Sequence, residues 1–207
     1  LFNPNHSEKF DFPKPHGGGT AYMNTIDKDG LGVSLIQSNF HGIGSRIGVG
    51  SFGFFLHNRG CGFNLDSGHP NYLTPGRKPL HTLSPTIWSK NGNLEFIAGT
   101  RGGRYQPQLL IQTILPYIQK SDSFEEIIKE PRWVIENFSS ETISKLRFEK
   151  INNEDLEILL KKGHEVEVEN KLNKAYGPIS IIYKKDDGNF EGVCDVRVGT
   201  EKVFNSF

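Results

Sequence analysis

Alternating apolar and polar positions predict β-strands at both ends of the chain. Residues 21–27 and 31–38 alternate in this way on either side of an Asp-Lys-Asp-Gly turn, which is the pattern of a β-hairpin. The stretch 59–80 is rich in glycine and proline and predicts a long loop, of the kind that is functional or disordered. Further strand-like patterns lie at residues 54–58, 86–90, 94–98, 179–183 and 190–196.

Helical periodicity dominates the middle of the chain. Residues 108–118 predict a helix, which their proline, Pro116, should kink or end. Ser123 and Glu126 have the spacing of a capping box, so a helix is expected to start there and to cover residues 123–129.

The charged stretch 145–169 is interpreted most simply as a helix with a solvated face. Within it, the leucines of residues 153–162 form a helical stripe that ends at Gly163, a residue suited to a helix C-terminus. Residues 165–169 alternate valine with glutamate. Strands at both ends of the chain with helices between them predict a layered α+β domain.

Composition narrows the function classes. The 207 residues are enough for one substantial core, and 24 basic residues balance 24 acidic ones. This balance argues against nucleic acid or an anionic membrane as the main partner. No apolar run has membrane-spanning length, and the first residues do not resemble a signal peptide. Two cysteines, Cys61 and Cys194, favour a reducing compartment, hence the cytoplasm, while localisation is left open.

Glycine is the unusual component, with 23 residues concentrated between Gly17 and Gly103. Three of them directly precede Thr20, at the start of a predicted strand. If the bond between Gly19 and Thr20 were cut, Thr20 would carry both a nucleophilic hydroxyl and an α-amine whose pKa near neutrality lets it act as the base. The simpler interpretation of the same residues is a flexible hinge before a strand.

Gly102 and Gly103 lie where a predicted strand breaks before a helix. Adjacent backbone N–H groups at such a break form a cradle for a developing oxyanion. Taken alone, the pair is explained more simply by a plain strand-to-helix turn. Four arginines near these loops are candidates for binding a substrate carboxylate, with solvated surface groups as the alternative: Arg46, Arg59, Arg101 and Arg104.

Metal and cofactor chemistry is not indicated. The histidines match no zinc-ligand spacing, two cysteines do not complete one, and no G-x-S-x-G precedes a helix. We therefore expect no metal and no cofactor.

Several stretches together resemble one family in order along the chain. From Thr20 to about Gly199 the sequence is similar to the small subunit of the gamma-glutamyltransferases, also called gamma-glutamyltranspeptidases. The matching stretches are T-x-x-x-x-x-x-D-K-D-G from Thr20, QSNFHGIGS, GFFLHNRG, GHPNYLTPGRKPLHTLSPT, GTRGG, EPRW, LRFEK and GVCDVRVG.

This resemblance implies an αββα four-layer sandwich of the N-terminal-nucleophile hydrolases, made by self-cleavage of one precursor. Thr20 aligns with the catalytic threonine, Ser38 with a second hydroxyl residue that binds it, and Gly102 and Gly103 with the oxyanion-hole glycines. Residues 1–19 would be the end of the large subunit and residues 20–207 the catalytic small subunit. The large subunit from the same precursor is the expected partner, and an oligomer of such heterodimers is left open.

The resemblance also implies departures in the substrate pocket. Phe40 stands where the family usually has asparagine, and Arg59 where it has glutamine. Gly62 aligns with the acid that pairs with the substrate's α-amine, and His81-Thr82 replaces a Ser-Ser pair that contacts the carboxylate. These changes turn an ammonium-binding field into a carboxylate-binding one and indicate a divergent, cephalosporin-acylase-like branch.

The sequence is therefore consistent with three alternative functions. The first is an autoprocessed amidohydrolase that forms an ester on Thr20 and passes the acyl group of a small-molecule amide to water. The second is gamma-glutamyl transfer from glutathione-like donors. The third is a homologue that is not processed and is inactive because Gly19 still acylates Thr20.

Overall fold

The computed structural model describes residues 19–120, 122–136, 145–199 and 203. Its strands form a two-stranded hairpin, a four-stranded sheet and a three-stranded sheet. The hairpin pairs β1 (Thr20–Ile26) with β2 (Gly32–Ser38), which confirms the first predicted hairpin. The four-stranded sheet is antiparallel, in the order β3 (Thr86–Lys90), β4 (Asn93–Thr100), β8 (Ile179–Lys184) and β9 (Phe190–Cys194).

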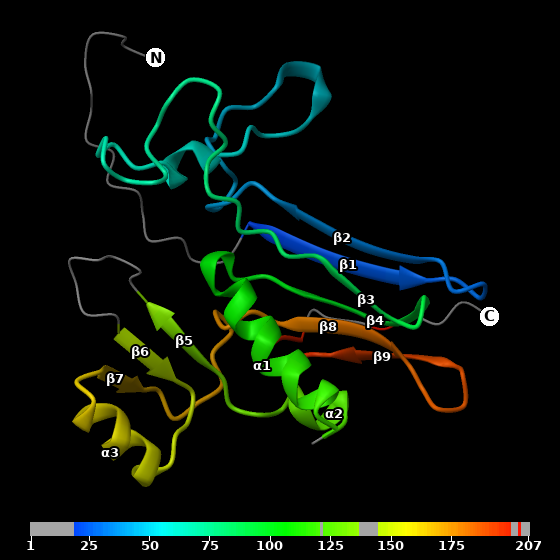
Figure 1. The fold of residues 1–207 in the computed structure, drawn as a ribbon. Helices are drawn as coiled ribbons and strands as arrows, with labels where there is room; N and C mark the ends of the chain where they lie inside the picture. Colours follow the sequence, from blue (N-terminus) through cyan, green and yellow to red (C-terminus); the bar gives the residue numbers. More distant parts are fainter. Residues whose placement is uncertain (1–18, 121, 137–144, 200–202, 204–207) are drawn as a thin grey trace, which may run out of the picture.

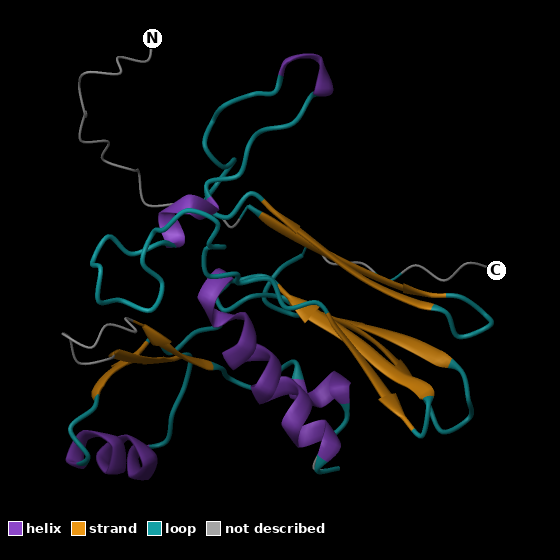
Figure 2. Ribbon diagram, turned by 45° about the horizontal axis from the view of Figure 1, so that its top comes forward, coloured by secondary structure: helices purple, strands orange, loops and turns teal. Residues whose placement is uncertain are grey.

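Helices cover one face of this sheet and the hairpin covers the other (Figures 1 and 2). Helix α1 (Gln106–Ile118) packs on β4, and α2 (Phe124–Ile127) packs on α1. On the opposite face, β1 and β2 contact β4 and β8. The described residues thus give the order helix, sheet, sheet, which confirms a mixed α+β fold; they do not supply a fourth layer.

The hydrophobic core lies between the helices and the four-stranded sheet. Leu109 and Ile114 of α1 face Phe96 of β4 and Ile181 of β8, and all four are at most 3% exposed. Phe124 of α2 closes this core. Because α1 presents Leu109, Leu110, Thr113 and Ile114 on one side, a helical stripe buries the sheet face as the 3.6-residue period requires.

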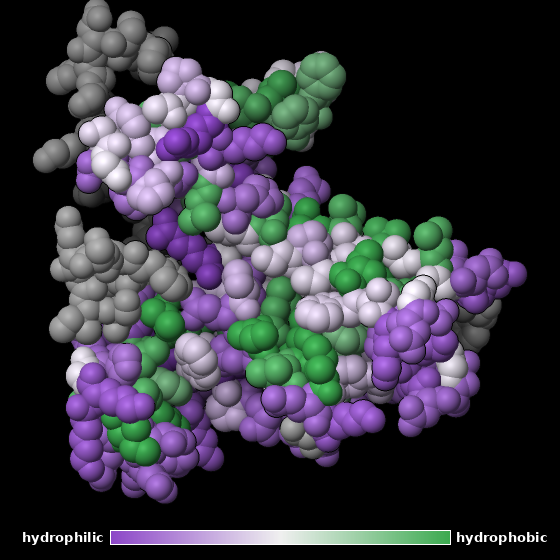
Figure 3. Space-filling view, viewed as in Figure 1, coloured by the Kyte–Doolittle hydropathy of each residue, from purple (hydrophilic) through white to green (hydrophobic). Residues whose placement is uncertain are grey.

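Three short 3-10 turns connect the layers. They are η1 (Gly50–Phe52), η2 (Arg59–Gly62) and η3 (Gly103–Tyr105), the last leading directly into α1. The loop that carries η1 projects from the body and is apolar at its tip (Figure 3), with Ile47 and Phe52 59% and 78% exposed.

The third sheet forms a separate small unit with α3 (Asn153–Lys161). It pairs β5 (Trp133–Glu136) with β6 (Lys145–Phe148) antiparallel and β6 with β7 (Glu165–Val168) parallel. The helix predicted at residues 153–162 is confirmed, with Gly163 at a positive φ of 84° just beyond it.

Four expectations need correction. The stretch 145–169 is not one helix, because Lys145 and Arg147 on β6 form ion pairs with glutamates of β7 that only adjacent strands bring together. Residues 54–58 form no strand, since the loop folds back on itself and leaves a single bridge, Gly48 to Phe55. Helix α1 neither ends at Pro116 nor starts at Gln108. A proline in the last turn removes only one helical hydrogen bond, so the helix runs two residues further.

Candidate functional site

The site begins at the first residue of β1. Thr20 is paired in register with Ser38, the last residue of β2, so the two hydroxyl side chains lie on the same face of the hairpin. Thr20 Oγ1 donates a hydrogen bond of 2.8 Å to Ser38 Oγ. The N–H of Phe40 donates to the same Ser38 oxygen at 2.9 Å. Ser38 is thereby fixed, and it holds the Thr20 hydroxyl in one orientation.

Gly19 directly precedes the strand. Its carbonyl oxygen accepts a hydrogen bond of 3.2 Å from the N–H of Asn39. The peptide between Gly19 and Thr20 therefore lies at the end of the β1–β2 pairing.

Gly102 and Gly103 form the turn between β4 and α1. Their φ angles of 128° and 57° lie in the region that favours glycine, so the turn depends on the absence of side chains. Thr100, fully buried at the end of β4, donates from Oγ1 to the carbonyl of Pro178 at 2.9 Å. Two successive N–H groups thus start a helix at a defined place, which is the arrangement expected of an anion cradle.

The packing of the β1–β2 hairpin on the four-stranded sheet places Thr20 and the Gly102–Gly103 turn at the same end of the two sheets. The ring of Tyr22 lies on Gly99, where any side chain would overlap it, while Gly32 at the far end of the hairpin lies against Leu94 and Ile97. Strand β1 therefore starts over the end of β4, the end from which the Gly102–Gly103 turn follows (Figure 1). Burial raises the pKa of Tyr22, whose hydroxyl shares a hydrogen bond of 2.9 Å with Ser34.

A second group of residues surrounds the guanidinium of Arg59. This side chain is only 6% exposed, donates from Nη1 to Thr82 Oγ1 at 3.2 Å, and lies 5.2 Å from the centre of the Phe40 ring. Its Nη2 is buried and has no hydrogen-bond partner among the described residues. We call Arg59, Thr82 and Phe40 the Arg59 group. It joins the nucleophile through Phe40, whose N–H binds Ser38.

The electrostatic field around the Arg59 group is positive. Partial desolvation lowers the pKa of His41, and the charges of Arg104 and Arg59 lower it further. Within the described part of the chain, no carboxylate forms an ion pair with either arginine. An anion is therefore the ligand that this surface favours.

The other residues singled out in the sequence are placed differently. His81 is exposed, next to the buried Thr82. The carbonyl of Gly62 accepts a hydrogen bond from the Asn71 side chain. Arg46 is exposed at a positive φ of 64°. Of the four arginines proposed as carboxylate anchors, Arg59 is the buried one.

Asn58 was not singled out in the sequence, although it organises the loop after Ser38. Its side chain accepts from the N–H of His41 at 2.9 Å and donates to the carbonyls of His41 and Gly44, both at 3.2 Å. Its own N–H donates to the carbonyl of Asn39 at 3.1 Å. All these partners are backbone groups, so no residue pattern points to them.

A network of buried ion pairs lies near the Gly102–Gly103 turn. Sequence spacing did not predict this network. Arg132 donates from Nη1 to the carbonyl of Gly177 at 2.7 Å and from Nη2 to Asp195, and Arg197 pairs with both Asp195 and Glu149. All four charged residues are at most 4% exposed. Gly177 packs so closely on the carbonyl of Arg101 that a side chain would overlap it.

The four come from three motifs far apart in the sequence: EPRW, LRFEK and GVCDVRVG. The charged residues within these three motifs were the available signal.

The network's neighbour Tyr105, in η3, donates its hydroxyl to Glu136 at 3.1 Å. Burial, together with the negative charge of Glu136, raises the pKa of Tyr105 to about 12. Tyr105 thus remains a neutral hydrogen-bond donor at ordinary pH and ties the turn to β5.

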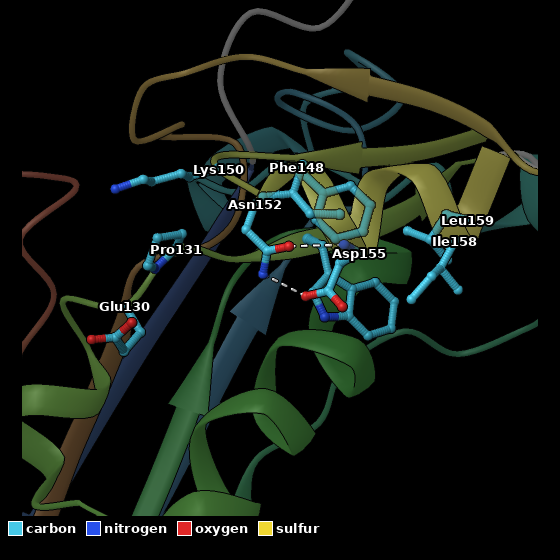
Figure 4. Close-up of a pocket in the computed structure, with 10 residues that line it drawn as sticks. Glu130, Pro131, Phe148, Lys150, Asn152, Asp155, Ile158 and Leu159 are labelled. Carbon is cyan, nitrogen blue, oxygen red and sulfur yellow. Dashed lines mark hydrogen bonds between the residues drawn. The ribbon is translucent and has the colours of Figure 1, made fainter.

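A hollow of about 620 Å³ lies elsewhere, between α3 and the β5–β6 strands (Figure 4). Trp133, Phe148 and Ile158 give it apolar walls, and Asn152 and Asp155 are hydrogen-bonded to each other at its edge. None of its lining residues belongs to the Thr20 site or the Arg59 group.

The described residues contain no group of three or more histidine, cysteine, aspartate or glutamate side chains placed to hold a metal ion. No helix among them combines the length and apolar character needed to cross a bilayer.

Proteins of known family are similar to this chain in sequence. The family model described as gamma-glutamyltranspeptidase matches residues 2–204. The glutathione hydrolase-like YwrD proenzyme of Bacillus subtilis (strain 168) is 35% identical over 185 residues, covering 89% of this chain and 35% of that protein. The oxamate amidohydrolase proenzyme of Klebsiella pneumoniae is 33% identical over 189 residues, covering 88% of this chain and 36% of that protein. The chain spans about a third of the length of these relatives.

Solved structures are also similar to this chain in fold. Cephalosporin acylase from Bacillus halodurans superposes with a TM-score of 0.73 at 31% identity, covering 85% of this chain and 32% of that one. The gamma-glutamyltranspeptidase from Pseudomonas nitroreducens complexed with L-DON has a TM-score of 0.72 at 21% identity, covering 89% of this chain and 99% of that one. At the latter identity the likeness concerns the fold alone.

Proposed function

This chain belongs to the gamma-glutamyltranspeptidase family, and we propose that it is the catalytic small subunit of an autoprocessed amidohydrolase with Thr20 as its nucleophile. The observation that carries the proposal is the 2.8 Å hydrogen bond from Thr20 Oγ1 to Ser38 Oγ, at the end of the sheets where the Gly102–Gly103 turn lies. Two relatives above 30% identity are proenzymes of hydrolase type, which supports the same reaction class.

The reaction follows from these groups. Cleavage before Thr20 frees its α-amine, which accepts the proton of the Thr20 hydroxyl as the oxygen attacks the substrate's amide carbonyl. The N–H groups of Gly102 and Gly103 stabilise the oxyanion that forms. The leaving amine takes the proton, and the ester on Thr20 is then hydrolysed by water, which restores the free hydroxyl. Ser38 orients the nucleophile throughout.

The large subunit of the same precursor completes the fold in this proposal. Residues up to Gly19 belong to that subunit after cleavage, and it adds strands and the fourth, helical layer. Two observations support this. The chain spans about a third of its relatives' length. In addition, the outer face of the β1–β2 hairpin exposes Met23, Val33 and Leu35 by 53%, 46% and 49%, an apolar face that a further layer would cover.

The substrate class in this proposal is an amide whose acyl part carries a carboxylate. The Arg59 group offers a buried guanidinium with an unpartnered Nη2, and Gly62 provides no acid for an α-amine. Arginine binds carboxylates through two parallel hydrogen bonds, for which a free nitrogen is needed. The K. pneumoniae relative is an oxamate amidohydrolase, and oxamate is an amide with a neighbouring carboxylate. Thr82, which accepts a hydrogen bond from Arg59, and the adjacent His81 lie beside this guanidinium.

Substitution of Thr20 by alanine in the full-length precursor tests the function. We expect Thr20→Ala to leave one uncleaved chain by intact-mass measurement and to abolish hydrolysis of glutaryl anilides, since both steps use the same hydroxyl. The wild-type product must begin at Thr20. Retained turnover in the variant would identify a different nucleophile and refute the proposal.

The same assay separates the two alternatives. If the wild-type rate increases when a dipeptide acceptor is added, the enzyme is a gamma-glutamyl transferase instead. If the wild-type chain stays uncut and inactive, the unprocessed homologue is the correct description.

A further inference from the structure

The carbonyl that self-cleavage must attack is itself bound in this structure. The Gly19 oxygen accepts a hydrogen bond of 3.2 Å from the N–H of Asn39, one residue beyond the Thr20–Ser38 pair. Asn39 and Ser38 are neighbours in sequence, so one short segment contacts both reacting groups. Ser38 holds the attacking hydroxyl, and Asn39 holds the carbonyl that it attacks.

The segment that supplies this N–H has a fixed and strained shape. Phe40 has a φ of 76°, a conformation that side-chain-bearing residues seldom adopt, and Gly42 has a φ of 55°. Asn58 maintains the shape through its bonds to both backbone groups of His41 and to the carbonyls of Asn39 and Gly44. Strain of this kind persists only where surrounding contacts enforce it.

The fit around Gly19 is equally specific. A methyl group on Gly19 would overlap the carbonyl of Gly42, a backbone group that Asn58 holds through the adjacent His41. Only glycine therefore permits the peptide to enter the segment with its oxygen on Asn39. By contrast, a methyl group on Gly68 would make an ordinary contact with Asp66.

We propose that residues 39–42, held by Asn58, form a second oxyanion site that serves self-cleavage only, with the Asn39 N–H as donor and Asn58 as its positioning residue. This rests on the proposed function. Thr20 Oγ attacks the Gly19 carbonyl carbon, and the oxygen turned toward Asn39 takes up the negative charge. The C–N bond then breaks, and the hydroxyl proton passes to the Thr20 nitrogen. Water hydrolyses the resulting ester, giving a Gly19 carboxylate and a free Thr20. The Gly102–Gly103 turn serves the later substrate.

Gly19→Ala in the full-length precursor tests the site. We expect the first-order rate of cleavage, followed by intact mass, to fall about 100-fold, the order of loss seen when one oxyanion donor is removed. Gly68→Ala is the matched control and should cleave at the wild-type rate. The fraction of Gly19→Ala that does cleave should hydrolyse substrate, which shows that the fold has survived. Cleavage of Gly19→Ala at the wild-type rate would overturn the proposal.

Hydroxylamine identifies the affected step. It cleaves esters but not peptides, so it accelerates only the second half of the reaction. If Gly19→Ala is slow because the acyl shift lacks its donor, hydroxylamine will not restore the rate. A restored rate would place the defect after the shift and would refute the role of Asn39.

Asn58→Asp supplies an independent variant of similar size. It replaces the donors to two carbonyls by an acceptor, so we expect slower cleavage here too. Asn64→Asp is its control. The Asn64 side chain accepts a hydrogen bond from the N–H of Asp66 at 2.7 Å, and aspartate keeps that acceptor. Normal cleavage of Asn58→Asp would remove Asn58 from the proposal. These results are separate from the proposed function, which is tested by whether cleaved protein hydrolyses amides and whether Thr20→Ala abolishes that hydrolysis.

Discussion

Arg59 is a charged side chain buried with an unused hydrogen-bond donor. Burial of an unsatisfied polar group is costly, and a charged group costs more. Such a cost is commonly retained where a ligand meets the donor. The neighbouring Phe40 ring stabilises the cation through its π face, while Nη2 has no hydrogen-bond partner among the described residues.

Replacing Arg59 by glutamine tests this role. We expect Arg59→Gln to lower kcat/KM for a glutaryl anilide by roughly 10- to 100-fold, because a charge-assisted hydrogen bond contributes about 1.5–3 kcal/mol. Turnover of a γ-glutamyl anilide should be maintained or improved, since an arginine that repels its ammonium is gone.

The matched control is Arg46→Gln, because Arg46 is exposed and lies outside the Arg59 group. Equal kcat/KM values for the glutaryl substrate in wild type and Arg59→Gln would contradict the assignment of Arg59 as the anchor.

At this scale the sequence predicted the type of chemistry more readily than the geometry. The local pattern of glycines marked Thr20 and the Gly102–Gly103 pair as candidates, and the family resemblance added Ser38. The structure brings Thr20 and Ser38 into contact. Asn39 and Asn58 could not be found in this way. Asn39 acts through its backbone, and the Asn58 side chain binds only backbone groups, so residue type alone carries no signal for either.

Secondary-structure elements were predictable where one face is buried and the other is exposed. β1 and β2 alternate between intermediate and high exposure along their whole length, which is the two-residue period of a strand. The more exposed face is the apolar one, with Val33 and Leu35. Prediction was wrong at 145–148 and 165–168, where charge dominates the composition. There, lysine and arginine on β6 meet glutamates on β7, and a cross-strand ladder looks like a solvated helix face when its partner strand is unknown. β5 was missed because its four residues are too few to show a period.

The buried ion network joins these elements. Asp195, just after β9, accepts from Arg132 near β5 and from the N–H of Ile179, the first residue of β8. We expect Asp195→Asn to destabilise the full-length protein by about 3–5 kcal/mol, because it leaves a buried arginine uncompensated. Denaturant unfolding measures the loss.

Asp187→Asn is the control for Asp195→Asn. Asp187 forms an exposed pair with Lys185 at 3.7 Å, and its removal should change stability by less than about 0.5 kcal/mol. Equal effects of the two substitutions would mean that the network does not hold β5, β8 and β9 together.

On the scale of the whole molecule, the proposed large subunit would make this chain one side of a larger sandwich. Its helix layer and four-stranded sheet share a complete core, whereas its hairpin has an apolar outer face. No sequence pattern in the described residues indicates what covers that face, because the proposal assigns the covering residues to the large subunit. Local patterns alone predicted only an α+β class, and the expected order of layers came from the family resemblance.

Chemical labelling of the full-length protein tests whether the outer face of the β1–β2 hairpin is covered. We expect Met23→Cys to be protected from a maleimide reagent, because the proposed large subunit covers it. Lys161→Cys, on the exposed side of α3, should react. Peptide mass spectrometry distinguishes these positions from the native cysteines. Equal labelling of both positions would show that the hairpin's outer face remains open to solvent.

The contact of Tyr22 with Gly99 limits which residues can replace Gly99. The two sheets lie this close at the reactive end because Gly99 has no side chain that would meet the Tyr22 ring. Any larger residue at position 99 would lift the first strand, and with it the Thr20 oxygen, away from the helix start below. The alignment of the attacking and charge-accepting groups is thus determined by a residue that touches neither.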